Sequence, residues 1–196
     1  RASIVLCHGV NSHGGQYLWV ASQLVAAGFA AYACDHRGRG RSEGPRFLIA
    51  DVSEYTEDLG QVIALAHARA PDRPVFLLGH SAGGVISCTW LLDHPSGVAG
   101  FICESFAFEV PAPAPVLALV RWLGRVAPKL PALKLKMADF TRDAEALRAL
   151  EADPLTRGEV QPAGTVAALL RAGDRMRREV STVQLPLLIM HGTADR

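Results

Sequence analysis

The stretch VFLLGHSAGG, Val75 to Gly84, decides the fold of this chain. Its four apolar residues, Val75 to Leu78, predict a short buried strand that stops at Gly79. Ser81 follows at the apex of a tight turn, and an apolar helical pattern begins directly after it. In a G-x-S-x-G sequence the glycines let a strand and a helix approach where side chains would clash, and the strained turn holds the hydroxyl out of the sheet. The stretch therefore predicts a nucleophile beside the free N–H groups of a helix start.

The composition is that of a globular protein. The 196 residues suffice for one large domain or for a core with an insertion. Residues are 49% hydrophobic and 20% charged, and a formal net charge of +1 does not favour nucleic acid as a partner. No apolar run approaches the ~20 residues of a membrane span, and we find no signal peptide.

The four cysteines lie in apolar stretches without the spacing of metal ligands. We expect three of them, Cys7, Cys34 and Cys103, in strands and Cys88 in a helix. Buried, reduced thiols of this kind favour the cytoplasm, and they give no reason to expect a metal or another cofactor.

Strand and helix patterns alternate along the first half of the chain. Apolar strands are predicted over residues 3–7, 29–34, 75–79 and 98–103, and helices over residues 17–27, 53–70 and 82–93. A further strand is predicted over residues 187–190. This alternation indicates an α/β fold with a mostly parallel sheet covered by helices on both faces, in which ligands bind at the carboxyl ends of the strands.

The alternation breaks between Phe106 and Thr182. Three prolines open this stretch, basic residues outnumber acidic ones, helices are predicted over residues 116–127, 143–150 and 164–171, and no strand pattern occurs. We interpret residues 106–182 as a helical cap inserted into a core of residues 1–105, with the chain returning to the core over residues 183–196. We expect the apolar residues Trp122, Leu123 and Val126 of the first cap helix to pack against the rest of the protein.

Acyl transfer by Ser81 requires an acid, a base and oxyanion donors. Asp195 lies in the loop after the last predicted strand and is the candidate acid, and Glu104, at the end of the preceding strand, is a second candidate. The oxyanion donors are predicted to be the N–H groups of Ala82, after the nucleophile, and Val10, in the loop after the first strand.

The turns that carry these two donors are formed by five flanking residues: His8, Gly9, Gly79, His80 and Gly83.

The base is not evident among the seven histidines. His80 adjoins Ser81, but its side chain should point elsewhere, and His8 and His191 are expected to orient loops. His67 and His94 lie at helix ends, where solvated or capping roles are expected. No histidine follows Asp195, and both ends of the chain fall next to predicted core strands. We therefore expect the base beyond Arg196, and these 196 residues to be inactive by themselves.

Five stretches together resemble the α/β-hydrolase superfamily and, within it, the monoacylglycerol lipase and lysophospholipase group of the S33 type. They are HGVNSHGGQY (8–17), DHRGRGRSEGPR (35–46), VFLLGHSAGG (75–84), ADPL (152–155) and LPLLIMHGTADR (185–196). The resemblance implies Ser81 as nucleophile, Asp195 as acid, and a catalytic histidine and first strands outside this sequence. Ala82 stands where methionine is common in that group.

The resemblance further implies a two-step hydrolysis of a carboxylic ester, with a small-molecule or lipid acyl ester as substrate and no cofactor. An apolar, basic cap would favour a long acyl chain and peripheral contact with an anionic membrane.

Three other interpretations remain. An S33-type serine peptidase would need an acidic site for the substrate amine, for which Glu104 and Glu109 are the only hints. A non-catalytic binding protein on the same fold would lack the base. A nucleic-acid patch at Arg37–Arg41 is disfavoured, because this short run adjoins acidic residues and a core strand.

Overall fold

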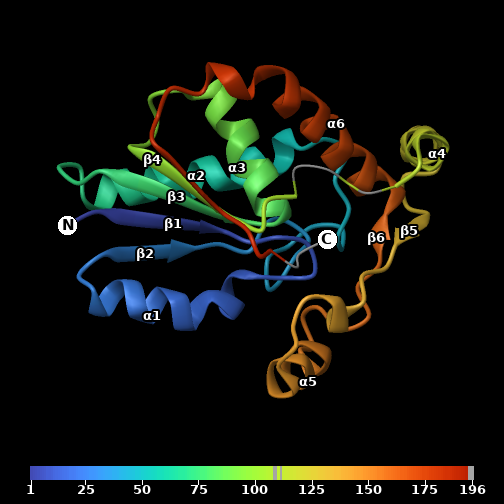
Figure 1. Ribbon diagram of the computed structural model, residues 1–196, viewed down its shortest axis with the longest axis horizontal. Coiled ribbons are helices and arrows are strands. Elements are labelled where there is room, and N and C mark those ends of the chain that lie inside the picture. The colour runs from blue at the N-terminus through green and yellow to red at the C-terminus, as the bar shows by residue number, and fades with distance from the viewer. Residues whose placement is uncertain (108–109, 111, 194–196) are drawn as a thin grey trace.

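The computed structural model describes residues 1–107, 110 and 112–193. Its main sheet has five parallel strands in the order β2-β1-β3-β4-β7. Their bounds are β1 Ser3–Cys7, β2 Ala30–Ala33, β3 Val75–His80, β4 Gly100–Glu104 and β7 Leu187–Met190. Figure 1 shows α1 (Leu18–Ala26) on one face of this sheet and α2 (Ser53–Arg69) and α3 (Ala82–Asp93) on the other. The predicted α/β fold is confirmed, with strand bounds shifted by one or two residues.

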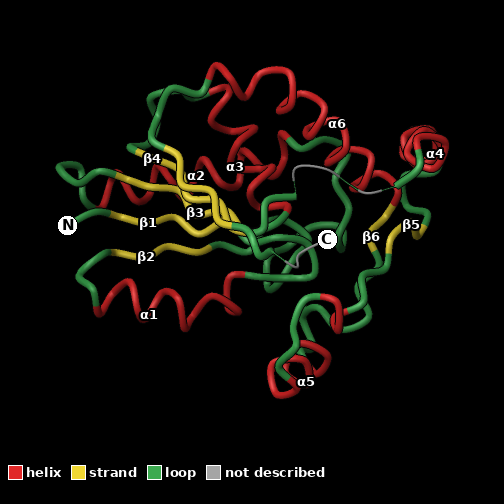
Figure 2. Tube along the Cα trace, viewed as in Figure 1, coloured by secondary structure: helices red, strands yellow, loops and turns green. Residues whose placement is uncertain are grey.

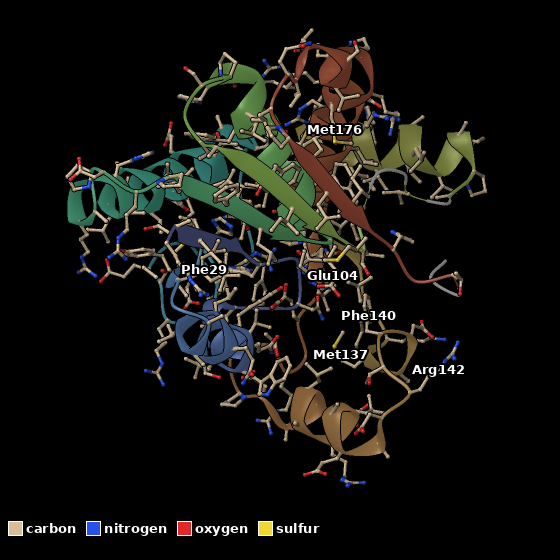
Figure 3. The ribbon with its side chains drawn as sticks, turned by 60° about the vertical axis from the view of Figure 1, so that its left-hand side comes forward. Phe29, Glu104, Met137, Phe140, Arg142 and Met176 are labelled. Carbon is tan, nitrogen blue, oxygen red and sulfur yellow. The ribbon has the colours of Figure 1, made fainter. Side chains whose placement is uncertain are left out.

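The core lies between the sheet and helices α2 and α3. Side chains at a helical spacing on α2, among them Tyr55, Leu59 and Ile63, are buried against strand residues such as Val5 and Leu77. Helix α3 is buried along nearly its whole length because it lies between the sheet, α2 and α6 (Ala163–Glu179). Met176 on α6, labelled in Figure 3, belongs to the same apolar cluster.

Residues 106–182 separate two adjacent parallel strands, β4 and β7. They form α4 (Ala114–Val126), α5 (Ala144–Ala152) and α6, the short 3-10 helices η2 (Met137–Asp139) and η3 (Val180–Thr182), and a two-stranded antiparallel pair. That pair, β5 (Pro131–Leu133) with β6 (Gln161–Pro162), corrects the expectation of an all-helical segment. Figure 2 shows α4, α5 and the pair beyond the carboxyl ends of the main strands. We call residues 106–182 the inserted segment.

Three further expectations were wrong in detail. Cys34 follows β2 instead of lying in it, although all four cysteines are free thiols. Strand β7 is not covered on both faces: its four residues are exposed, and it pairs only with β4 among the described strands. Trp122 and Val126 are 55% and 58% exposed, so more than half of each side chain is not packed against the described residues. No helix in the described ranges combines the length and apolar character needed to cross a bilayer.

Candidate active site

Ser81 occupies a strained turn between β3 and α3. Its φ of 54° and ψ of −121° place a non-glycine residue in a region that side chains disfavour. Three backbone bonds hold the turn: the Ser81 N–H donates to the Glu104 carbonyl (3.0 Å), and the Ser81 carbonyl accepts from the Gly84 N–H (3.0 Å) and the Ala107 N–H (3.4 Å). The half-buried serine is therefore fixed at the carboxyl edge of the sheet, as the sequence predicts.

The glycines around Ser81 allow backbone to meet backbone. A Cβ on Gly83 would lie 2.1 Å from the Cys7 carbonyl oxygen, and one on Gly79 would lie 2.8 Å from the Gly83 carbonyl oxygen. Both are far closer than real Cβ contacts, so β1, β3 and the start of α3 can approach only where these side chains are absent. This close approach makes the elbow that carries Ser81.

The loop after β1 lies directly against the serine. A Cβ built on Gly9 would be 3.1 Å from the Ser81 Cβ and 3.5 Å from its Oγ. Within the described ranges, neither the Val10 N–H nor the Ala82 N–H donates a hydrogen bond. The two predicted oxyanion donors thus belong to backbone segments that flank Ser81 and keep their hydrogens available for a ligand.

His8 holds this loop in place. Its Nε2 accepts the His36 N–H (3.2 Å), so Nδ1 carries the ring hydrogen and donates to the Gly9 carbonyl (2.8 Å). Burial lowers the pKa of His8 to about 4, and the nearby Arg39 guanidinium also lowers it. His8 is therefore a neutral donor that orients the loop, as expected from its place at a strand end.

His80 turns away from the elbow toward η1 (Gly14–Tyr17). Its Nδ1 lies 3.0 Å from the Tyr17 hydroxyl. Burial raises the pKa of Tyr17 to about 12, so the hydroxyl stays protonated and can donate to the ring. Tyr17 was not singled out as a site residue, and the only sequence signal for it was its place in the HGVNSHGGQY stretch.

Four further histidine rings, those of His13, His36, His67 and His94, contact groups other than Ser81. His67 contacts the Gly97 carbonyl (3.0 Å), and His94, at the end of α3, contacts the Trp90 carbonyl (2.9 Å). His13 accepts the Gly15 N–H at Nδ1, so its Nε2 donates to Asp153 (2.8 Å). His36 approaches the Cys7 sulfur (3.3 Å).

The two candidate acids differ in what the structure describes. Asp195 lies outside the described residues. The strand that precedes it in the chain, β7, pairs with β4 up to its last residue, where Met190 lies opposite Glu104. The Met190 carbonyl accepts a hydrogen bond from the Ser105 N–H (2.9 Å). The chain after β7 therefore starts at the edge that carries Ser81. Glu104 is exposed at the end of β4, where Figure 3 labels it.

The inserted segment contacts the loop after β1 at two places that sequence reasoning missed, one part-buried and one buried. Asp153, in the ADPL stretch, accepts from the His13 ring and from the Gln16 amide (both 2.8 Å). Glu159 accepts from the Asn11 N–H (3.1 Å) and pairs with Arg39, whose side chain is buried. Arg39 belongs to the basic run at 37–41, so this part of the run is an internal ion pair and not a surface patch.

Comparison with known proteins identifies the family. The family model described as serine aminopeptidase, S33 (Hydrolase_4) matches residues 1–196. The chain belongs to this α/β-hydrolase family. A monoacylglycerol lipase from Mycolicibacterium smegmatis is 36% identical over 198 residues, which cover 100% of this chain and 71% of that protein. A monoglyceride lipase from Rattus norvegicus is 31% identical over 199 residues, which cover 100% of this chain and 66% of that protein.

Solved structures agree with this assignment. The crystal structure of a monoacylglycerol lipase from Paleococcus ferrophilus matches with a TM-score of 0.86 at 28% identity, over 98% of this chain and 73% of that one. The S33-family chain thus spans about two thirds to three quarters of the length of these three relatives. The predicted superfamily, and the closer resemblance to monoacylglycerol lipases, are confirmed.

Proposed function

We propose that this S33-family protein is a serine hydrolase of carboxylic esters that acts on monoacylglycerol or lysophospholipid-type substrates. One observation carries the proposal: Ser81 stands at a positive φ on the elbow with Gly9 against it, and the Val10 and Ala82 N–H groups of the adjoining segments donate no hydrogen bond among the described residues. The names of the lipase relatives support the ester as substrate.

The proposed reaction has two steps. Ser81 Oγ attacks the acyl carbonyl as a histidine takes its proton, and the Val10 and Ala82 N–H groups bind the oxyanion. The histidine then protonates the departing alcohol, which leaves an acyl-enzyme. Water attacks the acyl carbon and gives its proton to the histidine, which passes it to Ser81 Oγ as the acyl–oxygen bond breaks and the fatty acid is released. In this proposal Asp195 orients the histidine, which lies beyond Arg196.

We further propose that the inserted segment is a cap over the acyl site, between a core of residues 1–105 and its return over residues 183–196. Helix α4 supports an interfacial role for this cap, because Leu119, Trp122 and Val126 are all more than half exposed on one face. Peripheral contact with a lipid surface would bring a long-chain ester to the site. A cytoplasmic location fits the four free thiols.

The test uses the full-length gene product and three substrates: a short p-nitrophenyl ester, a long-chain monoacylglycerol and an aminoacyl p-nitroanilide. We expect hydrolysis of both esters, faster for the long-chain one, and labelling by a fluorophosphonate probe. Ser81→Ala should abolish both activities and the labelling. Ser87→Ala, at a buried serine on α3, is the matched control and should keep them.

The alternatives give different outcomes in the same experiment. Faster cleavage of the anilide than of either ester would favour the peptidase. A folded protein that cleaves no substrate and does not react with the probe would favour a binding protein.

A further inference from the structure

A buried ion pair joins the inserted segment to the loop after β2, and its carboxylate also binds the loop that carries Val10. Arg39 and Glu159 are only 1% and 2% exposed. Glu159 Oε1 accepts three hydrogen bonds, from the Asn11 N–H (3.1 Å), the Arg39 guanidinium and the Gln161 side-chain amide. Its second oxygen, Oε2, has no hydrogen-bond partner among the described residues. A single carboxylate oxygen thus binds groups from three separate parts of the chain.

The same network holds Asn11 a second time. The Gln161 amide donates to Asn11 Oδ1 (3.1 Å), while Gln161 Oε1 accepts from Arg39 (2.7 Å). Arg39 is fixed in turn by a bond to the Tyr55 hydroxyl (2.9 Å). Both the backbone and the side chain of Asn11 are therefore bound to residues that are themselves buried and held.

This double attachment matters because of where Asn11 lies. It directly follows Val10, and its φ of 51° is a left-handed conformation that Asn tolerates better than most residues and that the two attachments select. On the other side of Val10, the Gly9 carbonyl is bonded to His8. The Gly9–Val10 peptide is trans, so the Val10 N–H points away from that carbonyl. The donor is thus fixed from both sides, by His8 before it and by Glu159 after it.

We propose that Glu159 is a positioning residue for the oxyanion hole: the inserted segment sets the direction of the Val10 N–H by holding Asn11. This inference rests on the proposed function. Stability alone does not explain the network, because a buried ion pair is often no more stabilising than apolar residues of similar volume. Other ion pairs, such as Arg175–Asp93, also join the inserted segment to the core, but they do not contact the loop that carries Val10.

Two double variants separate positioning from charge. Arg39→Met/Glu159→Gln removes both charges but keeps a side-chain oxygen that can accept the Asn11 N–H. Arg39→Met/Glu159→Leu removes both charges and that oxygen, with a similar side-chain volume. Asp93→Asn, which breaks the Arg175 pair, is the control for general loosening of the inserted segment. All are made in the full-length protein, and Tm, kcat and KM are measured with the p-nitrophenyl ester.

We expect the Leu variant to lose about tenfold in kcat with KM unchanged, which is less than the roughly 10²–10³ lost when a donor is removed outright. The Gln variant and Asp93→Asn should keep the kcat of the wild type, since both keep an acceptor for the Asn11 N–H. A trifluoromethyl ketone forms an oxyanion with the serine, so its inhibition constant should rise with the loss of kcat. A non-hydrolysable ether analogue should bind all variants equally.

Equal kcat in the Leu and Gln variants would overturn the proposal, as would a loss that appears only in KM or only in Tm. If both double variants fail to fold, Gln161→Met replaces them, because it keeps the ion pair and the bond to the Asn11 N–H. Its kcat should fall about threefold, and an unchanged kcat would overturn the proposal. A wild-type enzyme that cleaves no ester would instead contradict the proposed function.

Discussion

At the scale of single residues, the contact between Gly9 and Ser81 gives a sharp prediction. A methyl group at position 9 would lie 3.1 Å from both the His80 carbonyl oxygen and the Ser81 Cβ. The backbone at Gly9 and the backbone of His80 and Ser81 would have to separate by a few tenths of an ångström. We expect Gly9→Ala to lower kcat/KM for the p-nitrophenyl ester by about 10²-fold, because reacting groups tolerate little displacement.

The control for this substitution is Gly173→Ala on α6. A Cβ there meets only the far end of the Arg177 side chain, at 3.7 Å, so the change should leave kcat/KM unchanged and slightly raise Tm. Equal activity in the two variants would show that the contact with Ser81 does not constrain the reaction.

His8 predicts how stability depends on pH. Its pKa is about 4 in the folded protein and near 6.5 when unfolded, so between these values the unfolded chain binds more protons. Stability therefore falls as pH decreases through this window, and the contribution of His8 between pH 8 and pH 5 is about 2 kcal/mol. His8→Asn keeps a side-chain N–H close to the Gly9 carbonyl but cannot titrate.

Urea unfolding at pH 8 and pH 5 tests this expectation. The wild type should lose about 2 kcal/mol more than His8→Asn over that interval. The same loss in both proteins would mean that His8 does not remain neutral in the fold.

Sequence reasoning placed the strained turn at Ser81 and its glycines, because steric rules act between residues close in the chain. It did not find the network of Asn11, Arg39 and Glu159. These residues come from three distant segments, and local patterns do not encode which charged side chain meets which after folding. Arg39 was read only as part of a basic run, whereas the fold buries it against a carboxylate 120 positions away.

At the scale of elements, the strands and helices of the core follow closely from apolar periodicity. Helix α6 is longer than its predicted span of 164–171, because its second half is highly charged and held by ion pairs of Arg175 with Asp93 and Glu179. Strands β5 and β6 have three and two residues and contain prolines, so they are too short for an alternating pattern to reveal.

The crossing of α4 and α6 depends on Gly124. A Cβ at this position would lie 2.4 Å from the Ala167 Cβ and 2.9 Å from the Ala163 carbonyl oxygen. We expect Gly124→Val to separate the two helices and to lower the free energy of unfolding by about 1–3 kcal/mol.

Urea unfolding measures this loss. Ala118→Val, at an exposed position of the same helix, should cost only about 0.5 kcal/mol, which is the propensity difference. Similar losses in the two variants would mean that the helices do not cross as closely as the structure shows.

At the scale of the whole molecule, the inserted segment has two different sides. Its inner side reaches the loop after β1 through Asp153 and Glu159. Its outer side, along α4, exposes apolar residues to solvent. A lipid surface bound to α4 would therefore contact the same segment that holds the loop after β1, and in the proposed function this segment would link substrate uptake to the oxyanion hole.

The outer side gives the last prediction. Leu119 and Trp122 are 53% and 55% exposed on α4, and moving the exposed half of one such side chain from water into lipid is favourable by roughly 1–1.5 kcal/mol. Leu119→Ser or Trp122→Ser should therefore weaken binding to anionic phospholipid vesicles by about tenfold. Activity on monoacylglycerol in those vesicles should fall with it, while kcat/KM for a water-soluble p-nitrophenyl ester stays unchanged.

Leu65→Ser removes a leucine that is 43% exposed on α2, away from this face, and should alter neither activity. If Leu65→Ser weakened vesicle binding as much as Leu119→Ser, or if the soluble ester were affected equally, α4 would not be the surface that meets the lipid.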